Sequence, residues 1–289
     1  MNKPVLALIV LVLGTLSWAE TPNAASVKTQ QEATARLNKK AAMEAVSHGR
    51  FSATDCSFTF ATGKGLASMK YCVTANGNIV QIEIPKGFPL ISGTDFGEGY
   101  GVCDVGTQVA YSDYGGAGDS GNWGPATVLH HNPTSVKIAR TTSDGLWTLT
   151  QTITQVAGGS PSATIAMALR NNSAVSKEAF LVRYADVDVA GDLKNSFDNT
   201  LNSAFGWNSS SAAETGGPFG LVLQNLGTVP FGYTAFAQDT PDAPNPCDIV
   251  QHFAQAPAPT VDGSLVMFYD MVDIPSSGAA TVTVAYKGW

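Results

Sequence analysis

The stretch SVKIARTTSDGLWTLTQTITQV, residues 135–156, decides the fold class of this protein. Apolar and polar residues alternate along both of its halves, which is the period of a β-strand and not that of a helix. Asp144 and Gly145 lie between the halves and form a favoured two-residue hairpin turn. The register that this turn sets pairs Val136 with Ile153, Arg140 with Leu149, and Thr142 with Trp147.

The same alternation recurs along the chain from residue 50 onward. It is clear in NGNIVQIEIPKG (76–87), SATIAMALRNNS (162–173), EAFLVRYADVDV (178–189) and GAATVTVAYKGW (278–289). Turns rich in Gly, Pro, Asn and Asp separate more than a dozen such short segments. We therefore expect an all-β protein in which residues 50–289 form a single large antiparallel β-sandwich domain.

The N-terminal residues have the pattern of a secretory signal peptide. Lys3 precedes an apolar run from Val5 to Leu16, and Ser17-Trp18-Ala19 supplies the small residues of a cleavage site. The apolar run is too short for a membrane span, so we expect cleavage after residues 1–19 and a secreted or periplasmic protein without a membrane span. Residues 20–49 are rich in helix formers, which favours a short helix or a partly ordered lead-in.

The composition argues against two classes of partner. The 16 Lys and Arg residues stand against 23 Asp and Glu, and the net charge of −7 disfavours nucleic acid and anionic membrane surfaces. Charged residues make up only 13% of the chain and Gly is abundant at 29 residues, which fits an exported β protein better than a helical one.

Four cysteines form an even set, as expected for disulfides in an oxidising compartment. Residues 54–74 have the pattern of two β-strands around Gly63-Lys64-Gly65, and a turn centred on Lys64 would place Cys56 opposite Cys72. The remaining pair, Cys103 with Cys247, would then close a long loop. The spacing of the four is not that of a zinc site.

The segment AGDSGNWGP, residues 117–125, contains the Gly-Asp-Ser-Gly tetrapeptide that surrounds the nucleophile of trypsin-like proteases. Such a protease needs its His base and its Asp before a serine that comes late in the domain. Ser120 lies before the midpoint of the chain, and the one upstream histidine, His48, is in the lead-in. We interpret the segment as a long loop and exclude a serine protease.

The longer stretch YSDYGGAGDSGNWG, residues 111–124, is also a candidate sugar-binding surface. Aromatic faces beside amide and carboxylate groups are typical of carbohydrate recognition, because rings stack on sugar C–H faces while polar groups bind hydroxyls. An alternative stays open, in which the rings are buried and the polar residues cap turns. The candidate ligand-binding residues are Tyr111, Tyr114, Asp119, Asn122 and Trp123.

The segment LVRYADVDVAGDLKNSFDNT, residues 181–200, concentrates acidic residues. Asp186 and Asp188 share one face of a strand, and a Gly-containing loop with further acids follows. The candidate metal ligands are Asp186, Asp188, Asp192, Asn195 and Asp198. Calcium is the cation that such a set of oxygens favours, although the spacing is not that of an EF-hand. Two alternatives stay open: a general acid/base pair, and a solvated loop whose acids pair with Arg183 or Lys194.

At YCVTANGNIVQIEIPKG (71–87), GEGYGVCD (97–104) and LVRYADVDVAGD (181–192) the chain resembles exported bacterial β-sandwich proteins without an assigned activity. The run of strands and the closing GAATVTVAYKGW are similar to the supersandwich of galactose-mutarotase-like carbohydrate-processing proteins. That second resemblance implies a supersandwich-like fold. It does not extend to the catalytic His and Glu of that group, so it implies no activity.

We expect a non-enzymatic binding or surface-interaction module with carbohydrate or another envelope protein as its partner. The alternative is a carbohydrate-active enzyme, such as an epimerase, lyase or hydrolase, with acids drawn from Asp186, Asp188 or Glu98. Few Glu and His residues occur in the strand region, which favours the binding module. A structural component of an envelope assembly is a third possibility.

Overall fold

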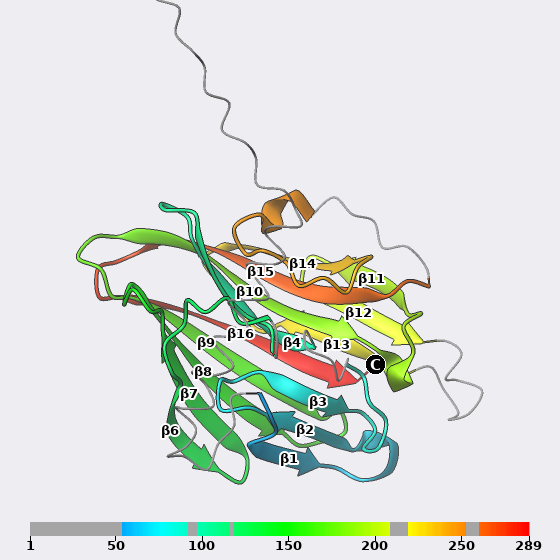
Figure 1. Ribbon diagram of the computed structural model, residues 1–289. Coiled ribbons are helices and arrows are strands. Elements are labelled where there is room, and N and C mark those ends of the chain that lie inside the picture. Colours follow the sequence, from blue (N-terminus) through cyan, green and yellow to red (C-terminus); the bar gives the residue numbers. More distant parts are fainter. Residues whose placement is uncertain (1–53, 92–96, 116–117, 209–218, 253–259, 289) are drawn as a thin grey trace, which may run out of the picture.

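The computed structural model describes residues 54–91, 97–115, 118–208, 219–252 and 260–288. Three antiparallel sheets make up this part of the chain (Figure 1). The largest has eight strands in the order β11 (Ser196–Thr200), β12 (Ser203–Asn208), β13 (Phe219–Asn225), β16 (Ala279–Gly288), β9 (Ser162–Asn171), β8 (Trp147–Val156), β7 (Ser135–Thr141) and β6 (Thr127–Asn132).

The other two sheets are smaller. The five-stranded sheet has the order β14 (Gly232–Gln238), β15 (Gly263–Ile274), β10 (Lys177–Val187), β4 (Glu98–Asp104) and β5 (Val109–Asp113). The three-stranded sheet consists of β1 (Phe58–Thr62), β2 (Met69–Val73) and β3 (Ile79–Glu83). Three short 3-10 turns complete the described elements: η1 (Gly65–Ala67), η3 (Val189–Gly191) and η4 (Ile249–His252). The all-β prediction is confirmed.

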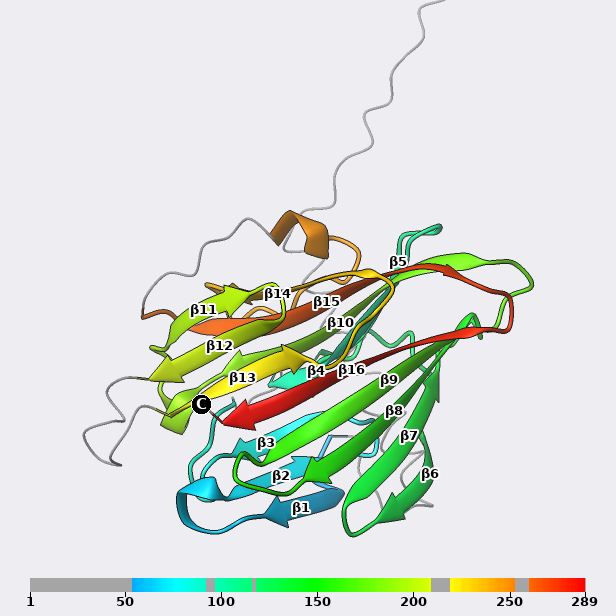
Figure 2. The ribbon, with the colours of Figure 1, turned by 180° about the vertical axis from the view of Figure 1, so that it is seen from behind.

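The two larger sheets pack as a sandwich, with the three-stranded sheet beside the five-stranded one (Figures 1 and 2). One apolar core joins all three sheets, because side chains such as Phe60, Leu149, Leu181 and Leu265 belong to a single buried cluster. A second apolar cluster lies on the outer face of the five-stranded sheet. β10 contributes side chains to both clusters because successive residues point to opposite faces of the sheet. Leu181 points into the main core and Val182 into the outer cluster.

The register of the hairpin that opened the sequence analysis is confirmed. Val136 pairs with Ile153 and Arg140 with Leu149 between β7 and β8, and the N–H of Thr142 donates to the carbonyl of Trp147. The inward side chains of β8 are buried, while Thr148, Thr150, Thr152 and Thr154 on its other face are half-exposed.

Both predicted disulfides form, but the register predicted for the first hairpin is wrong. Cys56 bonds to Cys72, and Cys103 to Cys247. Cys72 lies opposite Thr59, not Cys56, because η1 lengthens the connection and moves its centre from Lys64 to between Gly65 and Leu66. Cys56 therefore reaches Cys72 from just before the start of β1.

The signal peptide expected at 1–19, the lead-in at 20–49 and the domain boundary at residue 50 lie outside the described residues. Among the described residues, no helix has the length and apolar composition that a membrane span requires.

Candidate functional site

Three aspartates from two neighbouring strand ends converge at one edge of the five-stranded sheet. Asp186 lies at the end of β10, Asp188 follows it, and Asp262 directly precedes β15. β10 and β15 run antiparallel, with Val187 opposite Gly263, so the end of one strand lies beside the start of the other. One carboxylate oxygen from each of the three lies within 4.8 Å of the other two. We call Asp186, Asp188 and Asp262 the acidic triad.

Burial makes the charge of the acidic triad costly. Asp186 is 5% exposed and Asp188 is 7% exposed, while Asp262 is half-buried. Burial, and secondarily the nearby charge of Asp242, raises the pKa of the Asp262 carboxyl. Like charges in a partly desolvated site repel, and a bound cation relieves that repulsion. The triad therefore has the composition and the spacing to hold a metal ion.

Asn195 links the two chain segments that carry the triad. Its side-chain amide donates to the carbonyl of Val187 at 2.8 Å, between Asp186 and Asp188. Its backbone exchanges two hydrogen bonds with Val261, the residue before Asp262, both at 2.9 Å. The Oδ1 of Asn195 is buried and accepts no hydrogen bond from any described residue. This oxygen belongs to the residue that joins the two segments of the triad.

Of the five metal ligands predicted from sequence, the structure therefore brings Asp186 and Asp188 together and sets Asn195 next to them. Asp192 lies apart from the triad: it accepts the N–H of Lys194 at 2.9 Å and the side-chain amide of Asn208 at 2.9 Å. These two hydrogen bonds lower the pKa of Asp192. Asp198 is exposed on β11.

Asp262 was missed because no local pattern marks it. It is far from Asp186 in sequence, and only the pairing of β10 with β15 joins them. The sequence predicts both strands but does not predict which strands are neighbours.

Glu98, the third acid considered for an enzyme, lies in the interior of the sandwich. It forms an ion pair with Arg183 in which both side chains are fully buried. It also accepts the hydroxyl of Tyr286 at 2.9 Å and the N–H of Ile79 at 2.6 Å. Burial raises the pKa of Glu98, although Arg183 and these donors oppose the rise. Both oxygen atoms of this carboxylate accept hydrogen bonds from the protein, which is the arrangement of a structural ion pair.

The turn between β2 and β3 closes this polar interior. The carbonyl of Asn76 accepts the Tyr100 hydroxyl at 2.9 Å and the Gln151 amide at 3.3 Å. The carbonyl of Gly77 accepts Arg183 at 3.3 Å, and the Asn78 amide donates to Asp113 at 3.0 Å. Groups of this turn thus satisfy polar or charged side chains from both large sheets, as buried polar groups require.

Both the backbone conformation and the space at Gly77 favour glycine, so an alanine at this position should destabilise the protein. Its φ is +90°, and a Cβ there would lie 2.4 Å from Nε2 of Gln151. Gly87 has φ +93° but open space around it, so Gly87→Ala is a matched control for the backbone strain alone. We expect Gly77→Ala to cost about 1–3 kcal/mol more than Gly87→Ala in urea denaturation. Equal losses would mean that the turn is not held against Gln151.

The Gly-Asp-Ser-Gly segment is fixed by its own hydrogen bonds. The hydroxyl of Ser120 accepts the N–H of Ser112 at 3.0 Å. Asp119 forms an ion pair with Arg140 at 3.0 Å, and Asn122 donates to the carbonyl of Ala110 at 2.9 Å. These contacts show that the three polar residues hold the segment against neighbouring parts of the chain.

The three aromatic residues of the stretch 111–124 lie in the interior. Tyr111, Tyr114 and Trp123 are all buried, and the Arg140 guanidinium lies 5.7 Å from the centroid of the Trp123 ring. The hydroxyl of Tyr111 donates to Asp144. The described part of the segment therefore presents no aromatic face on which a sugar could stack.

Comparison with known proteins identifies the fold and not the family. No protein-family model matches the sequence, and no curated protein sequence matches it. Among solved structures, a bacterial glucoamylase in complex with acarbose is similar with a TM-score of 0.53 and 10% identity. The match covers 83% of this chain but only 33% of the glucoamylase, so this chain spans a third of that protein's length. At this identity the similarity shows a shared β-sandwich fold and nothing further.

Two further structures are similar at lower scores. An Escherichia coli K12 protein provisionally designated an aldose 1-epimerase has a TM-score of 0.45 and 10% identity, with 80% of this chain and 99% of that chain covered. The Slr1438 protein of Synechocystis sp. PCC 6803 has a TM-score of 0.46 and 8% identity, with 82% and 97% covered. These scores are too low to define the fold more closely.

Proposed function

We propose that this protein is an exported, non-enzymatic β-sandwich module that holds calcium at the acidic triad and binds a carbohydrate. The observation that carries the proposal is the convergence of three carboxylates from β10 and β15 within 4.8 Å. Two disulfides and the leader-like residues 1–19 support export.

Calcium is the cation that the donor set favours. All three groups of the triad are carboxylates and the neighbouring Asn195 offers an amide oxygen, so the site is built of hard oxygen donors. Calcium accepts six to eight oxygens in flexible geometry, whereas magnesium demands a nearly ideal octahedron. Three carboxylates and one amide leave coordination positions for water or for hydroxyl groups of a ligand.

The carbohydrate part of the proposal rests on the shared fold and on the position of the acids. The similar glucoamylase was crystallised with acarbose, and we extend that class of ligand to this chain. Glu98 is enclosed with Arg183 in the interior, and the acids of the triad would be occupied by the cation. This arrangement favours binding over acid/base catalysis.

Calcium should stabilise the protein. The effect of one substitution on the free energy of unfolding should change sign between EDTA and calcium. At a calcium concentration of 100 times Kd the free energy of unfolding should rise by about 2.7 kcal/mol over the EDTA-treated protein. In EDTA, Asp262→Asn should leave stability equal or higher because it removes a repelling charge. In calcium the same variant should lose most of the 2.7 kcal/mol gain. Thermal melts with calcium titration measure both effects.

Asp198→Asn is the matched control, because Asp198 is an exposed carboxylate of the same region outside the triad. It should respond to calcium as the unaltered protein does. An unchanged melting temperature in calcium and in EDTA would refute the calcium site.

The calcium-loaded protein is then applied to a glycan array, where calcium-dependent binding without turnover is expected. An array without bound glycan would refute the carbohydrate ligand.

A further inference from the structure

A segment of chain crosses the outer face of the five-stranded sheet and covers its apolar cluster. It runs from the end of β14 to η4, and we call residues 239–249 the strap. Ile249 of the strap is fully buried among side chains from three strands and from the residue after β5. Those side chains are Tyr114, Val182, Tyr184, Phe236, Val266 and Phe268. The strap thus shields a second core from water.

The strap is fixed to the sheet near its end by a covalent bond. Cys247 of the strap bonds to Cys103 of β4, which is fully buried. Pro246 packs against the same strand, since a Cβ placed on Gly101 would lie 3.2 Å from it.

At its start the strap is fixed by hydrogen bonds that come from the neighbours of the acidic triad. The hydroxyl of Tyr184 donates to the carbonyl of Pro241, and the hydroxyl of Ser264 donates to the carbonyl of Thr240 at 2.9 Å. Tyr184 lies two residues before Asp186, and Ser264 two residues after Asp262. Residues two apart on a strand share a face, so these bonds hold the start of the strap beside the triad.

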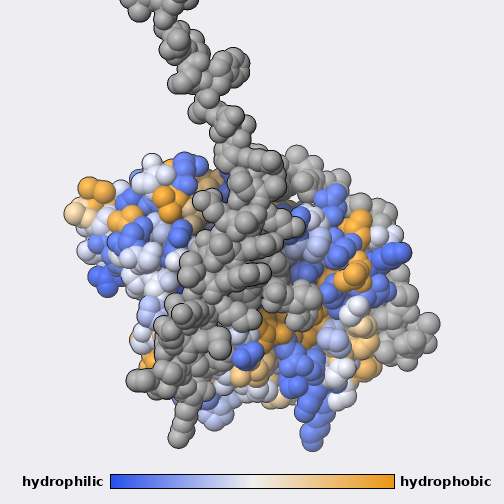
Figure 3. Space-filling view, viewed as in Figure 1, coloured by the Kyte–Doolittle hydropathy of each residue, from blue (hydrophilic) through white to orange (hydrophobic). Residues whose placement is uncertain are grey.

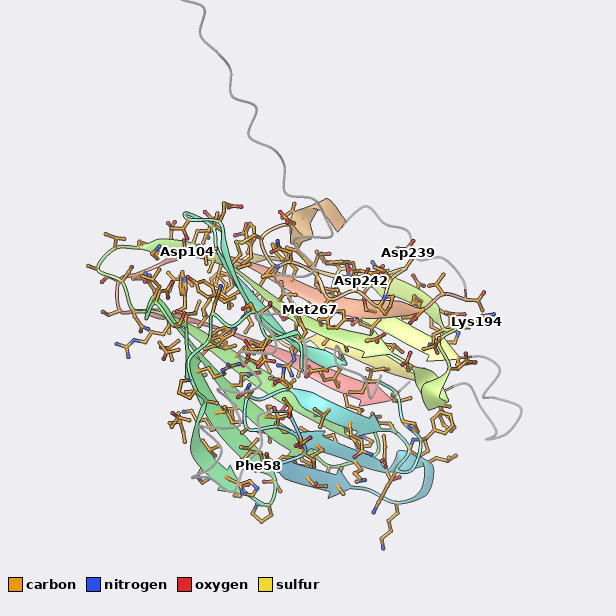
Figure 4. All side chains as sticks on the ribbon, viewed as in Figure 1. Phe58, Asp104, Lys194, Asp239, Asp242 and Met267 are labelled. Atoms are coloured by element: carbon orange, nitrogen blue, oxygen red, sulfur yellow. A yellow bond between two sulfur atoms is a disulfide. The ribbon has the colours of Figure 1, made fainter. Side chains whose placement is uncertain are left out.

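Asp242 adds a further negative charge at the start of the strap, near the acidic triad. The hydroxyl of Thr240 donates to its carboxylate at 2.9 Å, and its charge contributes to the raised pKa of Asp262. Figure 4 shows Asp242 and Asp239 near each other at this end of the sheet, with Asp104 at the opposite end. On the face seen in Figure 3, hydrophilic and hydrophobic residues of the described surface are intermixed. Asp242 thus lies on the part of the strap that Tyr184 and Ser264 hold beside the acidic triad.

We propose that a cation at the acidic triad closes the strap over the outer apolar face. This inference rests on the proposed function, because it requires the triad to bind calcium. With calcium bound, the carboxylate of Asp242 is attracted to the site and the start of the strap stays in place. Without calcium, the triad repels Asp242 and the start of the strap moves away from the sheet as far as Cys247, which exposes the Cys103–Cys247 disulfide to solvent. Binding and closure are then reciprocally coupled.

The accessibility of the Cys103–Cys247 disulfide reports strap opening. The full chain is treated with dithiothreitol in native buffer, with calcium at ten times its measured Kd or with EDTA, and the new thiols are alkylated and mapped by mass spectrometry. Calcium should slow reduction of Cys103–Cys247 by up to about elevenfold, the limit reached when the open form does not bind. The rate at Cys56–Cys72, where Cys56 is exposed outside the strap, should not change.

Two variants separate this coupling from a general stabilisation. Asp242→Asn should shrink the calcium effect on Cys103–Cys247 and weaken calcium binding by the same factor. Asp248→Asn, which removes another strap carboxylate that accepts the side-chain amide of Asn245 at 2.8 Å, should leave both quantities unchanged. Isothermal titration measures calcium binding independently. Calcium that binds but does not slow reduction would overturn the strap proposal alone, whereas calcium that does not bind would overturn the proposed function as well.

Discussion

Removal of the disulfide between Cys103 and Cys247 will lower the free energy of unfolding by about 5 kcal/mol. The bond joins residues 144 apart in sequence, and the loop-entropy model assigns the largest stabilisation to the longest closed loop. It also fixes the strap to β4. The double variant Cys103→Ala with Cys247→Ala, compared with the unaltered protein in guanidinium denaturation, measures the loss.

The second disulfide is the internal comparison. Cys56 and Cys72 are only 16 residues apart, and the corresponding double variant should lose about 3 kcal/mol. Both double variants remove the same atoms, so the difference of about 2 kcal/mol reports the lengths of the two loops. Losses that are equal, or in the reverse order, would contradict this account.

Replacement of Glu98 by Ala should cost about 3–5 kcal/mol. The substitution leaves the guanidinium of Arg183 fully buried without its carboxylate, and an uncompensated buried charge is among the most destabilising defects in a protein. The remaining hydrogen-bond partners of Arg183 include the side chain of Gln151, the carbonyl of Gly77 and the hydroxyl of Tyr286, none of which is charged. Urea denaturation of Glu98→Ala measures this cost.

Two further variants show whether the loss comes from the unpaired charge. Glu98→Leu combined with Arg183→Met removes both charges, and it should be more stable than either single variant because the desolvation cost disappears with them. Asp198→Ala, at an exposed carboxylate, should change stability by less than about 0.5 kcal/mol. A double variant that is less stable than both singles would show that the pair itself stabilises the fold.

Local alternation was enough to predict the fold class and one register. In β7 and β8 the alternation and the Asp144-Gly145 turn act over a few residues, so the pairing of Val136 with Ile153 could be derived. The hairpin of β1 and β2 failed in register because η1 lies inside a segment that looked like a minimal turn. Periodicity carries no information on how a connection folds.

The candidate site was only half predictable for a different reason. Asp186 and Asp188 are two residues apart at the end of a predicted strand, so a common direction follows from the period of two, although β10 itself ends at Val187. Asp262 joins them only through the pairing of β10 with β15, and strand order is a property of the whole chain. The buried turn at Asn76 and Gly77 was equally hidden, because Asn and Gly ordinarily mark turns at the surface.

The position of β16 bears on how the molecule assembles. It is the last of the described strands, yet it lies inside the eight-stranded sheet between β13 and β9 (Figure 2). The two halves of that sheet therefore stay unjoined, each with an unpaired edge, until β16 pairs with both. The hydroxyl of Tyr286 reaches Glu98 across 188 residues of chain in the same step. Folding should be slow, with exposed strand edges that favour aggregation whenever the pairing of β16 is delayed.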